Sequence, residues 1–450
     1  MSRISRQRLA ELHAREVQSF VDLHPQSAAR ADVAKQHLVG GVPMAWMSRW
    51  PGPFPITVTE ASGAHFSDVD GNHYIDLCLG DTGAMTGHGL AAVAEALFEQ
   101  AKRGITTMLP SEDAAWVGAE LTRRFGLPKW QMAMTATDAN RFILRFARHL
   151  TGRRKVLVFD YCYHGTVDET LAVLMADGTQ ITRPGNIGSA FDLSSTTTVV
   201  PFNDLAALEA ALATREIACV LAEPALTNIG IVMPDPGFHT ALRALTRKHG
   251  TMLAIDETHT ICLGPGGATT AWDLQPDLFV IGKAIGGGMP VAAYGMTEEV
   301  ASRLGPVLGD ESVDVSGVGG TLSGNALAMA AVRATFSNAL RDEDFAVATP
   351  LAERWTDGVQ AAIDGNGLDW HVQQLGCRAE YWFCPPPRNG GDAAAAGDGE
   401  LDAFMHLWAL NRGILLTPFH NMALLSPHHF DEDVDAHSSV FADAVGALLA

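Results

Sequence analysis

Lysine is scarce in this sequence. Of the 31 Lys and Arg residues among 450, only six are lysines. They are Lys35, Lys102, Lys129, Lys155, Lys248 and Lys283. Arginine therefore provides most of the positive charge. A lysine retained in an unusual setting indicates amine chemistry, because a guanidinium does not act as a nucleophile or base at neutral pH.

Positive charge is also deficient overall, since the formal net charge is −20 at pH 7. An acidic chain of this kind is not expected to bind nucleic acid or an anionic membrane surface. No apolar stretch approaches the roughly 20 residues that span a bilayer. Residues 1–20 lack the apolar core of a signal peptide and favour an exposed amphipathic helix. We therefore expect a cytoplasmic protein with no membrane partner.

Cysteine is sparse and scattered, with six residues in the whole chain. Their positions show no paired spacing typical of metal ligands, so free thiols, a reducing compartment and no metal site are expected.

The GxGxxG spacing after an early strand is also missing, although glycine clusters occur. A nucleotide-binding oxidoreductase is the rival that those clusters suggest, but "GKAIGGG" lies late in the chain and this hypothesis leaves Lys283 unexplained.

The length exceeds that of one usual hydrophobic core, so a large and a smaller domain are expected. Between about residues 90 and 330, short apolar runs alternate with helical patterns, which predicts βαβ units, a mostly parallel central sheet and helices on both faces. Asp70-Gly71 predicts a two-residue hairpin turn. We predict a large α/β domain at 76–334 and a smaller α+β domain built from 1–75 and 335–450, with "PPPRNGGDAAAAGDGE" as an exposed loop.

Chemically useful residues follow the predicted parallel strands. The carboxyl ends of such strands meet at one edge of the sheet, where ligands usually bind. The residues at these ends are Thr135-Ala136-Thr137, Tyr163-His164, Glu223, Asp256-Glu257 and Lys283.

Each of these residues alone has an ordinary structural interpretation. A threonine or aspartate can cap a helix, a tyrosine can be half buried, and a lysine can lie on a turn. Together they provide an amine, a carboxylate, a helix N-terminus for a phosphate and a ring for stacking. That combination is typical of a site for pyridoxal 5′-phosphate.

Local motifs in sequence order resemble one family. They are "VDGNHYIDL", "YHG", "AEP", "IDE", "GKAIGGGMPVAAYG" and "GTLSGNALAMAA". From about Gly40 to Ala331 the chain resembles the class III (fold type I) aminotransferases that depend on pyridoxal phosphate, in particular the branch similar to glutamate-1-semialdehyde aminomutase. The resemblance implies the fold type I architecture and a homodimer with shared active sites.

The resemblance also implies roles for particular residues. Lys283 is the Schiff-base lysine, and Asp256 is the partner of the pyridine nitrogen. The other implied cofactor-binding residues are Thr135, Ala136, Thr137, Tyr163, Glu223, Asn228, Thr258, His259 and Thr321. Of these, Thr321 corresponds to a threonine that reaches the phosphate bound by the neighbouring subunit.

The sequence departs from the family pattern at several positions. Ala136 replaces the usual glycine, and Thr258-His259 replace Val-Gln or Val-Met. No arginine follows "DETH" where many members bind an α-carboxylate, and Met47 stands where the aminomutase has an arginine. Arg49 and Arg378 are candidate replacements, with a structural role as the alternative for each. Trp46 is a candidate wall of the substrate pocket.

From these features we predict a transaminase that transfers an amino group from an amine or amino acid, including a β-amino acid, to a ketone, aldehyde or keto acid. The amine donor and the carbonyl acceptor are the expected small-molecule partners. The alternative is a glutamate-1-semialdehyde-type 2,1-aminomutase. A remote alternative is a cofactor-free binding protein on the same fold.

Overall fold

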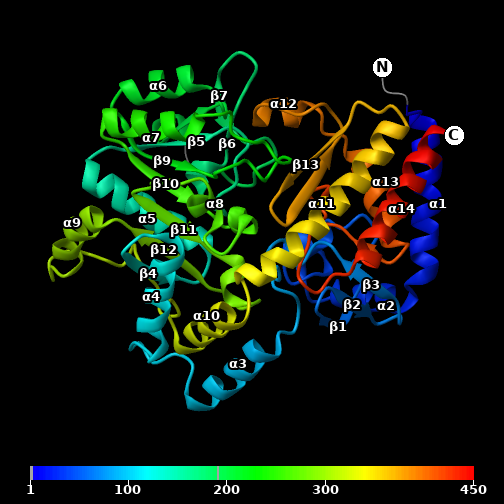
Figure 1. Ribbon diagram of the computed structural model, residues 1–450, viewed down its shortest axis with the longest axis horizontal. Coiled ribbons are helices and arrows are strands. Elements are labelled where there is room, and N and C mark those ends of the chain that lie inside the picture. The colour runs from blue at the N-terminus through cyan, green and yellow to red at the C-terminus, as the bar shows by residue number, and fades with distance from the viewer. Residues whose placement is uncertain (1–3, 190–191) are drawn as a thin grey trace. The chain divides into compact units, whose positions relative to one another are not determined.

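The computed structural model describes residues 4–189 and 192–450, so the first three residues of the predicted N-terminal helix region lie outside it. The chain forms two compact units (Figure 1). Unit 1 comprises Met1–Leu90, Glu343–Pro386 and Ala396–Ala450, and unit 2 comprises Ala91–Asp342 and Pro387–Ala395. The first boundary thus follows residue 90 rather than 75, and the second follows residue 342 rather than 334.

Unit 1 is built from helices around two small sheets. Its helices are α1 (Arg6–Leu23), α2 (Pro25–Ala34), α11 (Asp342–Gly365, from its second residue on), α13 (Gly399–Leu410) and α14 (Asp431–Leu449), with short 3-10 turns at η1 (Val39–Gly41) and η2 (Ala45–Ser48). One sheet has the order β1 (Val58–Ser62), β2 (His65–Asp68), β3 (His73–Asp76) and β15 (Ile414–Leu415). The other has the order β13 (His371–Leu375), β14 (Arg378–Trp382) and β16 (Met422–Leu424).

The hairpin between β2 and β3 differs from the predicted turn. The backbone N–H of Asp68 donates to the carbonyl of Asn72, so three residues, not two, lie between the closing pair. The Asp68 carboxylate accepts the N–H groups of Asp70 and Asn72, each at 2.9 Å. Gly71 takes a φ of 88° within this turn. An aspartate that satisfies two turn amides stabilises the longer loop.

Unit 1 contains a cluster of polar residues near β14, of which His406 and Asn421 are buried and Asp402 is partly buried. Asp402 of α13 accepts a hydrogen bond from Asn421 at 2.8 Å, and His406 contacts the same asparagine at 3.1 Å. Burial raises the pKa of Asp402 to about 6, because the Asn421 hydrogen bond only partly offsets the desolvation of the carboxylate. Ionisation of this carboxyl therefore opposes folding at neutral pH.

We expect Asp402→Asn to raise the free energy of unfolding at pH 7 by about 1–3 kcal/mol. The folded-state pKa of about 6 exceeds the ordinary value of 3.8, so the wild-type protein loses stability as pH rises between these values. The asparagine keeps an acceptor for Asn421 and carries no charge. Denaturant unfolding at pH 4 and pH 7 measures the difference, with exposed Asp443→Asn as the control. An equal effect of Asp402→Asn at both pH values would contradict this account.

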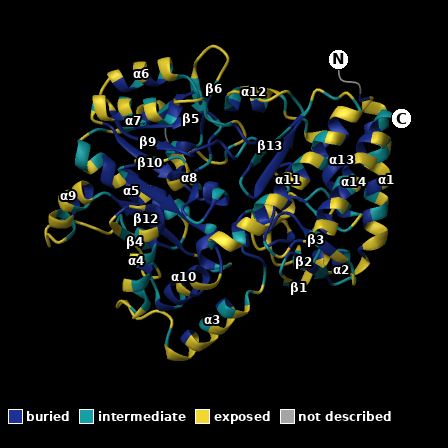
Figure 2. Ribbon diagram, in the orientation of Figure 1, coloured by how far each residue is buried: buried dark blue, intermediate teal, exposed yellow. Residues whose placement is uncertain are grey.

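Unit 2 has a central sheet with helices packed on it. Among the described residues, seven strands form it in the order β4 (Lys129–Ala133), β12 (Ala292–Met296), β11 (Leu278–Ile281), β10 (Met252–Asp256), β9 (Ile217–Ala222), β5 (Lys155–Phe159) and β8 (Thr197–Val200). β12 pairs antiparallel with both neighbours, and the other pairs are parallel. The mostly parallel sheet predicted from the sequence is therefore confirmed. The inner strands are buried along their lengths (Figure 2).

The remaining elements of unit 2 surround this sheet. They are α3 (Ala91–Arg103), α4 (Asp113–Phe125), α5 (Ala136–Thr151), η3 (Asp168–Thr170), β6 (Ala172–Leu174), β7 (Gln180–Thr182), η4 (Leu193–Ser195), α6 (Leu205–Ala213), α7 (Phe238–His249), η5 (Thr260–Leu263), α8 (Gly267–Ala271), η6 (Lys283–Gly286), α9 (Glu298–Leu308), α10 (Ala326–Asn338) and α12 (Gly390–Ala395). α12 forms within the segment predicted as a loop.

Helix α5 carries the clearest sequence signals. Thr135 is its N-cap and accepts from the N–H of Asp138, while Gly152 ends it in the left-handed conformation with a φ of 67°. Phe142, Ile143 and Phe146 are buried at helical spacing, and the helix packs on β4, β9, β10, β11 and β12. These contacts fix the N-terminus of α5 at the carboxyl edge of the sheet.

Within the described residues, no helix combines the length and the apolar character that crossing a bilayer requires.

Candidate functional site

The predicted site residues of unit 2 follow successive strands of the sheet. Thr135 follows β4, Tyr163 and His164 follow β5, Glu223 follows β9, Asp256 ends β10, and Lys283 follows β11. β10 and β11 are parallel neighbours, with Asp256 opposite Val280 in the register. The carboxylate of Asp256 and the amine of Lys283 therefore come from adjacent strand ends.

Asp256 is buried and accepts hydrogen bonds from several neighbours. Its Oδ2 accepts from Asn140 Nδ2 at 2.8 Å and lies 3.0 Å from His164 Nδ1. Its Oδ1 accepts from the N–H of Thr258 at 3.1 Å and from the Thr258 hydroxyl at 2.6 Å. This set of donors stabilises the ionised carboxylate.

The charge of Asp256 follows from these contacts. Burial by itself raises the pKa, but hydrogen bonds and the charge of His164, together with Thr258 and Asn140, lower it to about 2. Burial also lowers the pKa of His164, yet Cys162 and Asp256 outweigh it and hold that pKa well above its ordinary range. These contacts therefore favour the ionised form of the Asp256 carboxylate.

Asn140 was not among the site residues predicted from the sequence. Its side-chain amide is buried and also donates to the carbonyl of His164 at 3.1 Å, so it joins the His164 loop to Asp256. The signal was present in the sequence, because Asn140 lies three positions before Ile143 and seven before Ala147 on the apolar face of α5. A polar residue on such a face needs a buried partner.

The N-terminus of α5 is in close contact with the loops around it. Gly165 has a φ of 80°, and a Cβ at this position would clash with Thr137 Oγ1. Thr137 Oγ1 also accepts from the N–H of Thr166 at 3.1 Å. A Cβ on Gly282 would lie 3.1 Å from the Cβ of Ala136, so a glycine before Lys283 leaves room for that alanine. Ala136 is therefore compatible with a tight turn here.

Helix α5 can bind an anion at this end. The first N–H groups of a helix have no partners within it, and the helix dipole favours negative charge there. Thr135 also serves as an ordinary cap, because its hydroxyl oxygen accepts from the backbone N–H of Asp138 at 3.2 Å. The cap and a phosphate site are compatible, because the cap satisfies only one of the free amides.

Glu223 organises the loop that bears Tyr163. Its Oε1 accepts from the N–H of Tyr163 at 3.2 Å, and its Oε2 accepts from the N–H of Thr227 at 3.0 Å. Burial raises the pKa of Glu223, although the charge of His164 and these hydrogen bonds oppose the shift. Asn228 donates to the carbonyl of Tyr161 at 3.2 Å. Glu223 and Asn228 thus hold the aromatic loop in place.

Lys283 has an unusual backbone conformation. Its φ is 49°, in the left-handed region that few residues with a Cβ adopt. Its Nζ lies 2.8 Å from His259 Nε2, and its side chain is half buried. Such outliers are concentrated at functional sites, where the surrounding structure holds them.

Thr321 lies in the loop between α9 and α10 and does not follow a strand of the central sheet. It is exposed and, with Met108 and Leu109, lines a cavity of about 370 Å³. Met108 and Leu109 are 74% and 72% exposed, which is unusual for large apolar side chains.

The predicted substrate residues Trp46, Arg49 and Arg378 all belong to unit 1. Trp46 packs edge to face against Phe419, with ring centroids 5.8 Å apart, and Arg49 is exposed. Arg378 is fully buried and pairs with Glu380 at 3.2 Å. That ion pair is consistent with the structural alternative for Arg378. The roles of all three in substrate binding stay predictions.

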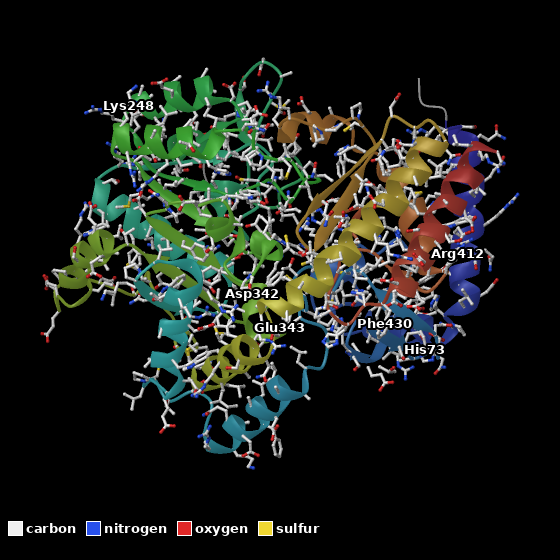
Figure 3. All side chains as sticks on the ribbon, in the orientation of Figure 1. His73, Lys248, Asp342, Glu343, Arg412 and Phe430 are labelled. Atoms are coloured by element: carbon white, nitrogen blue, oxygen red, sulfur yellow. The ribbon has the colours of Figure 1, made fainter. Side chains whose placement is uncertain are left out.

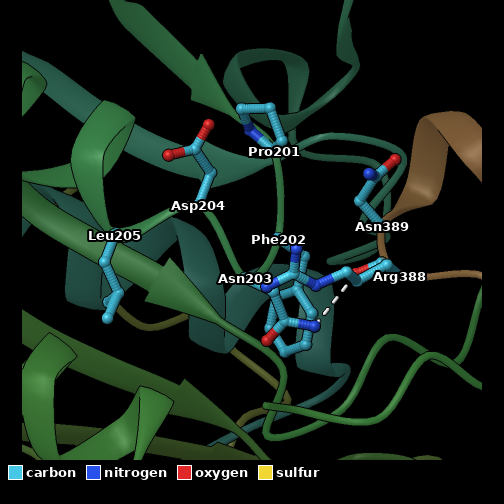
Figure 4. Close-up of a pocket in the computed structure, with 7 residues that line it drawn as sticks. All are labelled: Pro201, Phe202, Asn203, Asp204, Leu205, Arg388 and Asn389. Carbon is cyan, nitrogen blue, oxygen red and sulfur yellow. Dashed lines mark hydrogen bonds between the residues drawn. The ribbon is translucent and has the colours of Figure 1, made fainter.

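Another cavity of about 400 Å³ lies beyond the end of β8 (Figure 4). It is lined by Pro201, Phe202, Asn203, Asp204, Leu205, Arg388 and Asn389. Asn203 donates to the carbonyl of Arg388 at 2.9 Å, and the Arg388 guanidinium pairs with Asp235. None of the predicted site residues lines this cavity.

The arrangement around Asp256 and Lys283 fits a planar cofactor with an anionic group. A phosphate fits the N-terminus of α5, a basic ring nitrogen fits the Asp256 carboxylate, and a carbonyl fits the Lys283 amine. His164 Nε2 and Asn140 Oδ1 are buried without hydrogen-bond partners among the described residues. The polar atoms beside Asp256 therefore keep hydrogen-bonding capacity for a bound molecule. The donor set matches pyridoxal phosphate.

Comparisons with known proteins agree with this geometry. The family model for class-III aminotransferases matches residues 46–360. A relative from Sorangium cellulosum, glutamate-1-semialdehyde 2,1-aminomutase, is 35% identical over 437 residues, which cover 95% of this chain and 97% of the relative.

Solved structures are similar over nearly the whole chain. A lysine-to-alanine variant of a glutamate-1-semialdehyde aminomutase from Pseudomonas aeruginosa PAO1, in complex with PMP, is 48% identical with a TM-score of 0.98. The match covers 99% of this chain and 100% of that one. A β-phenylalanine aminotransferase from Variovorax paradoxus is 26% identical with a TM-score of 0.86, and the match covers 97% of each chain.

Proposed function

Because the chain belongs to the class-III aminotransferase family, we propose that it moves an amino group within one small substrate, in the manner of a 2,1-aminomutase. Its fold is that of the fold type I aminotransferases, and its cofactor is pyridoxal 5′-phosphate, as the sequence predicted. The main support for this proposal is the similarity to glutamate-1-semialdehyde aminomutases. This similarity favours the aminomutase, which was the alternative prediction from the sequence, over a general transaminase. Glutamate 1-semialdehyde is the first candidate substrate.

The residues of unit 2 have separate roles in this proposal. When bound, pyridoxal phosphate supplies an aldehyde that links to amines and a ring that accepts an electron pair. Asp256 stays ionised and holds a proton on the ring nitrogen. Lys283 provides the amine for attachment and then carries protons as general acid and base. The N-terminus of α5 binds the phosphate, and Tyr163 stacks on the ring.

A single-substrate assay tests the proposal. Moving the amino group of glutamate 1-semialdehyde from C2 to C1 gives 5-amino-4-oxopentanoate. The protein loaded with pyridoxal phosphate is expected to form this product without an added carbonyl acceptor. Because substrate and product are isomers of equal mass, the product is measured by chromatographic separation against authentic 5-amino-4-oxopentanoate. Failure to form it, with turnover of another amine and acceptor pair, would rule out the aminomutase. No visible absorbance after incubation with pyridoxal phosphate would favour a cofactor-free binding protein.

Intermolecular transamination is the second candidate. Met47 stands in place of the aminomutase arginine, and residues 260–272 contain no arginine. A carboxylate buried beside the cofactor needs a paired cation, for which arginine is the usual choice. The similarity to a β-phenylalanine aminotransferase is consistent with a donor whose carboxylate lies farther from the reacting carbon.

For this second candidate, we expect β-amino acids or arylalkyl amines to react faster than α-amino acids other than a small generic donor. Arg49 is the proposed cation for a more distant carboxylate, and Trp46 is the proposed apolar wall. The measurement is the spectrum of the bound cofactor after single additions from an amine panel. A fast change with glutamate and no change with the other two classes would contradict this view of the pocket.

We also propose a cytoplasmic homodimer in which Thr321 completes the phosphate site of the neighbouring subunit. The exposed apolar side chains of Met108 and Leu109 beside Thr321 support an interface at this place. An apolar patch of this kind is typical of a surface that another chain covers.

Thr321→Ala is expected to weaken cofactor retention by roughly 1.5–3 kcal/mol, because it removes a hydrogen bond to a charged phosphate. Cofactor dissociation, followed by absorbance, measures the loss, and Ser323→Ala is the matched control from the same cavity. Mixing Thr321→Ala with Lys283→Ala chains gives hybrid dimers whose one Lys283 site receives a normal threonine. If those hybrids retain cofactor no better than the Thr321→Ala homodimer, the site is not shared.

A further inference from the structure

We propose that His259 is the proton acceptor of the Lys283 amine, a role beyond the cofactor contact predicted for it from the sequence. This inference rests on the proposed function, because it assumes that Lys283 is the amine that attaches the cofactor. Three sets of observations support it: the contact itself, the anchoring of the His259 backbone, and the prior engagement of the neighbouring carboxylates.

The contact joins two nitrogen atoms. Lys283 Nζ lies 2.8 Å from His259 Nε2, within normal hydrogen-bond distance. An ammonium group donates but never accepts, so the imidazole nitrogen is the acceptor when the lysine is charged. The pair therefore has the geometry for a proton to pass from the amine to the ring.

The backbone of His259 is anchored on both sides. Before it, the N–H and hydroxyl of Thr258 donate to Asp256 Oδ1. After it, the hydroxyl of Thr260 donates to Glu257 Oε2, and the N–H of Ile261 donates to the Glu257 carbonyl at 3.0 Å. These bonds to Asp256 and Glu257 hold the residues on both sides of His259, which is the N-cap residue of η5.

The neighbouring acidic groups have other partners. Asp256 is engaged by His164, Asn140 and Thr258. Glu257 is engaged by Thr260 and by the N–H groups of Ala268 and Thr269. Glu223, after the next strand, accepts from Tyr163 and Thr227. His259 is a base in direct contact with the Lys283 amine, whereas these three carboxylates accept hydrogen bonds from other groups.

The proton step is simple. Attachment of a carbonyl to Lys283 requires a lone pair on Nζ, which the protonated amine lacks. Transfer breaks one N–H bond at Nζ, leaves its electron pair on that nitrogen, and forms an N–H bond at His259 Nε2. The imidazolium returns the proton in the reverse step. Glutamine at 259 would preserve an acceptor and the lysine position but would not take the proton.

The test uses the apoenzyme, so that it does not depend on the natural substrate. The second-order rate of covalent attachment of pyridoxal phosphate is followed by visible absorbance for wild type, His259→Ala, His259→Gln and exposed His149→Ala as the control. We expect His259→Ala to lower this rate by about 100-fold and His259→Gln by more than about 10-fold. His149→Ala is expected to match wild type, and circular dichroism checks that each variant is folded.

Chemical rescue separates proton transfer from positioning. Imidazole added to His259→Ala is expected to restore attachment at least 10-fold, and more basic methylimidazoles are expected to restore it further. A His259→Gln rate within about threefold of wild type, or an absence of rescue, would overturn the inference. If wild type itself forms no covalent link to pyridoxal phosphate, the proposed function fails instead.

Discussion

Replacing Lys283 with alanine is expected to lower turnover by about 1,000-fold or more, since the variant loses both the attachment point and the general acid–base group. Borohydride reduction of the wild-type protein, followed by peptide mapping, is expected to place the cofactor label on Lys283. We expect the label on Lys283 because its amine is half buried beside His259. In addition, the strand that it follows is the neighbour of the strand that ends at Asp256.

Lys248→Ala is the matched control. Lys248 lies on α7 (Figure 3), where it is exposed and pairs with Glu209 at 2.6 Å. This variant is expected to keep both the label on Lys283 and normal turnover. A label found on Lys248 or Lys155 in the wild-type protein would refute the assignment of Lys283.

Asp256→Asn is expected to keep the bound cofactor and lose more than about 100-fold in turnover. The neutral amide does not hold a proton on the ring nitrogen, whereas the native carboxylate, with a pKa of about 2, is fully ionised at neutral pH. Steady-state kinetics and the absorbance of bound cofactor measure the two effects separately.

Exposed Asp177→Asn removes the same charge from the surface and serves as the control. Its turnover is expected to equal that of wild type. Near-normal turnover of Asp256→Asn would show that this aspartate only ties together Asn140, His164 and Thr258. Loss of the cofactor from the folded variant would instead assign it a role in retention.

The elements of the central sheet could be predicted from the sequence, because short apolar runs and the residues that bound them determine where strands begin and end. Apolar runs bounded by glycine and polar residues predict the buried strands, and parallel strands place their carboxyl ends at one edge. Asp256 and Lys283 could therefore be placed at adjacent strand ends without coordinates. Thr135, the N-cap of α5, is an equally local signal.

Features that depend on distant pairing were not predicted. Residues 76–90 join unit 1 because Gly63 and His88 form reciprocal backbone hydrogen bonds and the N–H of Leu77 donates to the carbonyl of Leu415 at 3.0 Å. Asn140 bonds to Asp256, 116 positions away. Hydrophobic periodicity describes neighbours along the chain, so it does not identify such partners.

The division of unit 1 into three chain segments has a consequence for synthesis of the protein. β3, in the first segment, forms a parallel pair with β15 near the far end of the chain, where Ile75 lies opposite Ile414. As the chain emerges from the ribosome, the continuous segment Ala91–Asp342 of unit 2 is complete long before β15 appears. Until β15 is synthesised, β3 is therefore an unpaired edge strand of the unit 1 sheet. Unpaired edge strands readily form hydrogen bonds with other chains. Truncations before residue 414 would leave this edge permanently open, so aggregation is their expected fate.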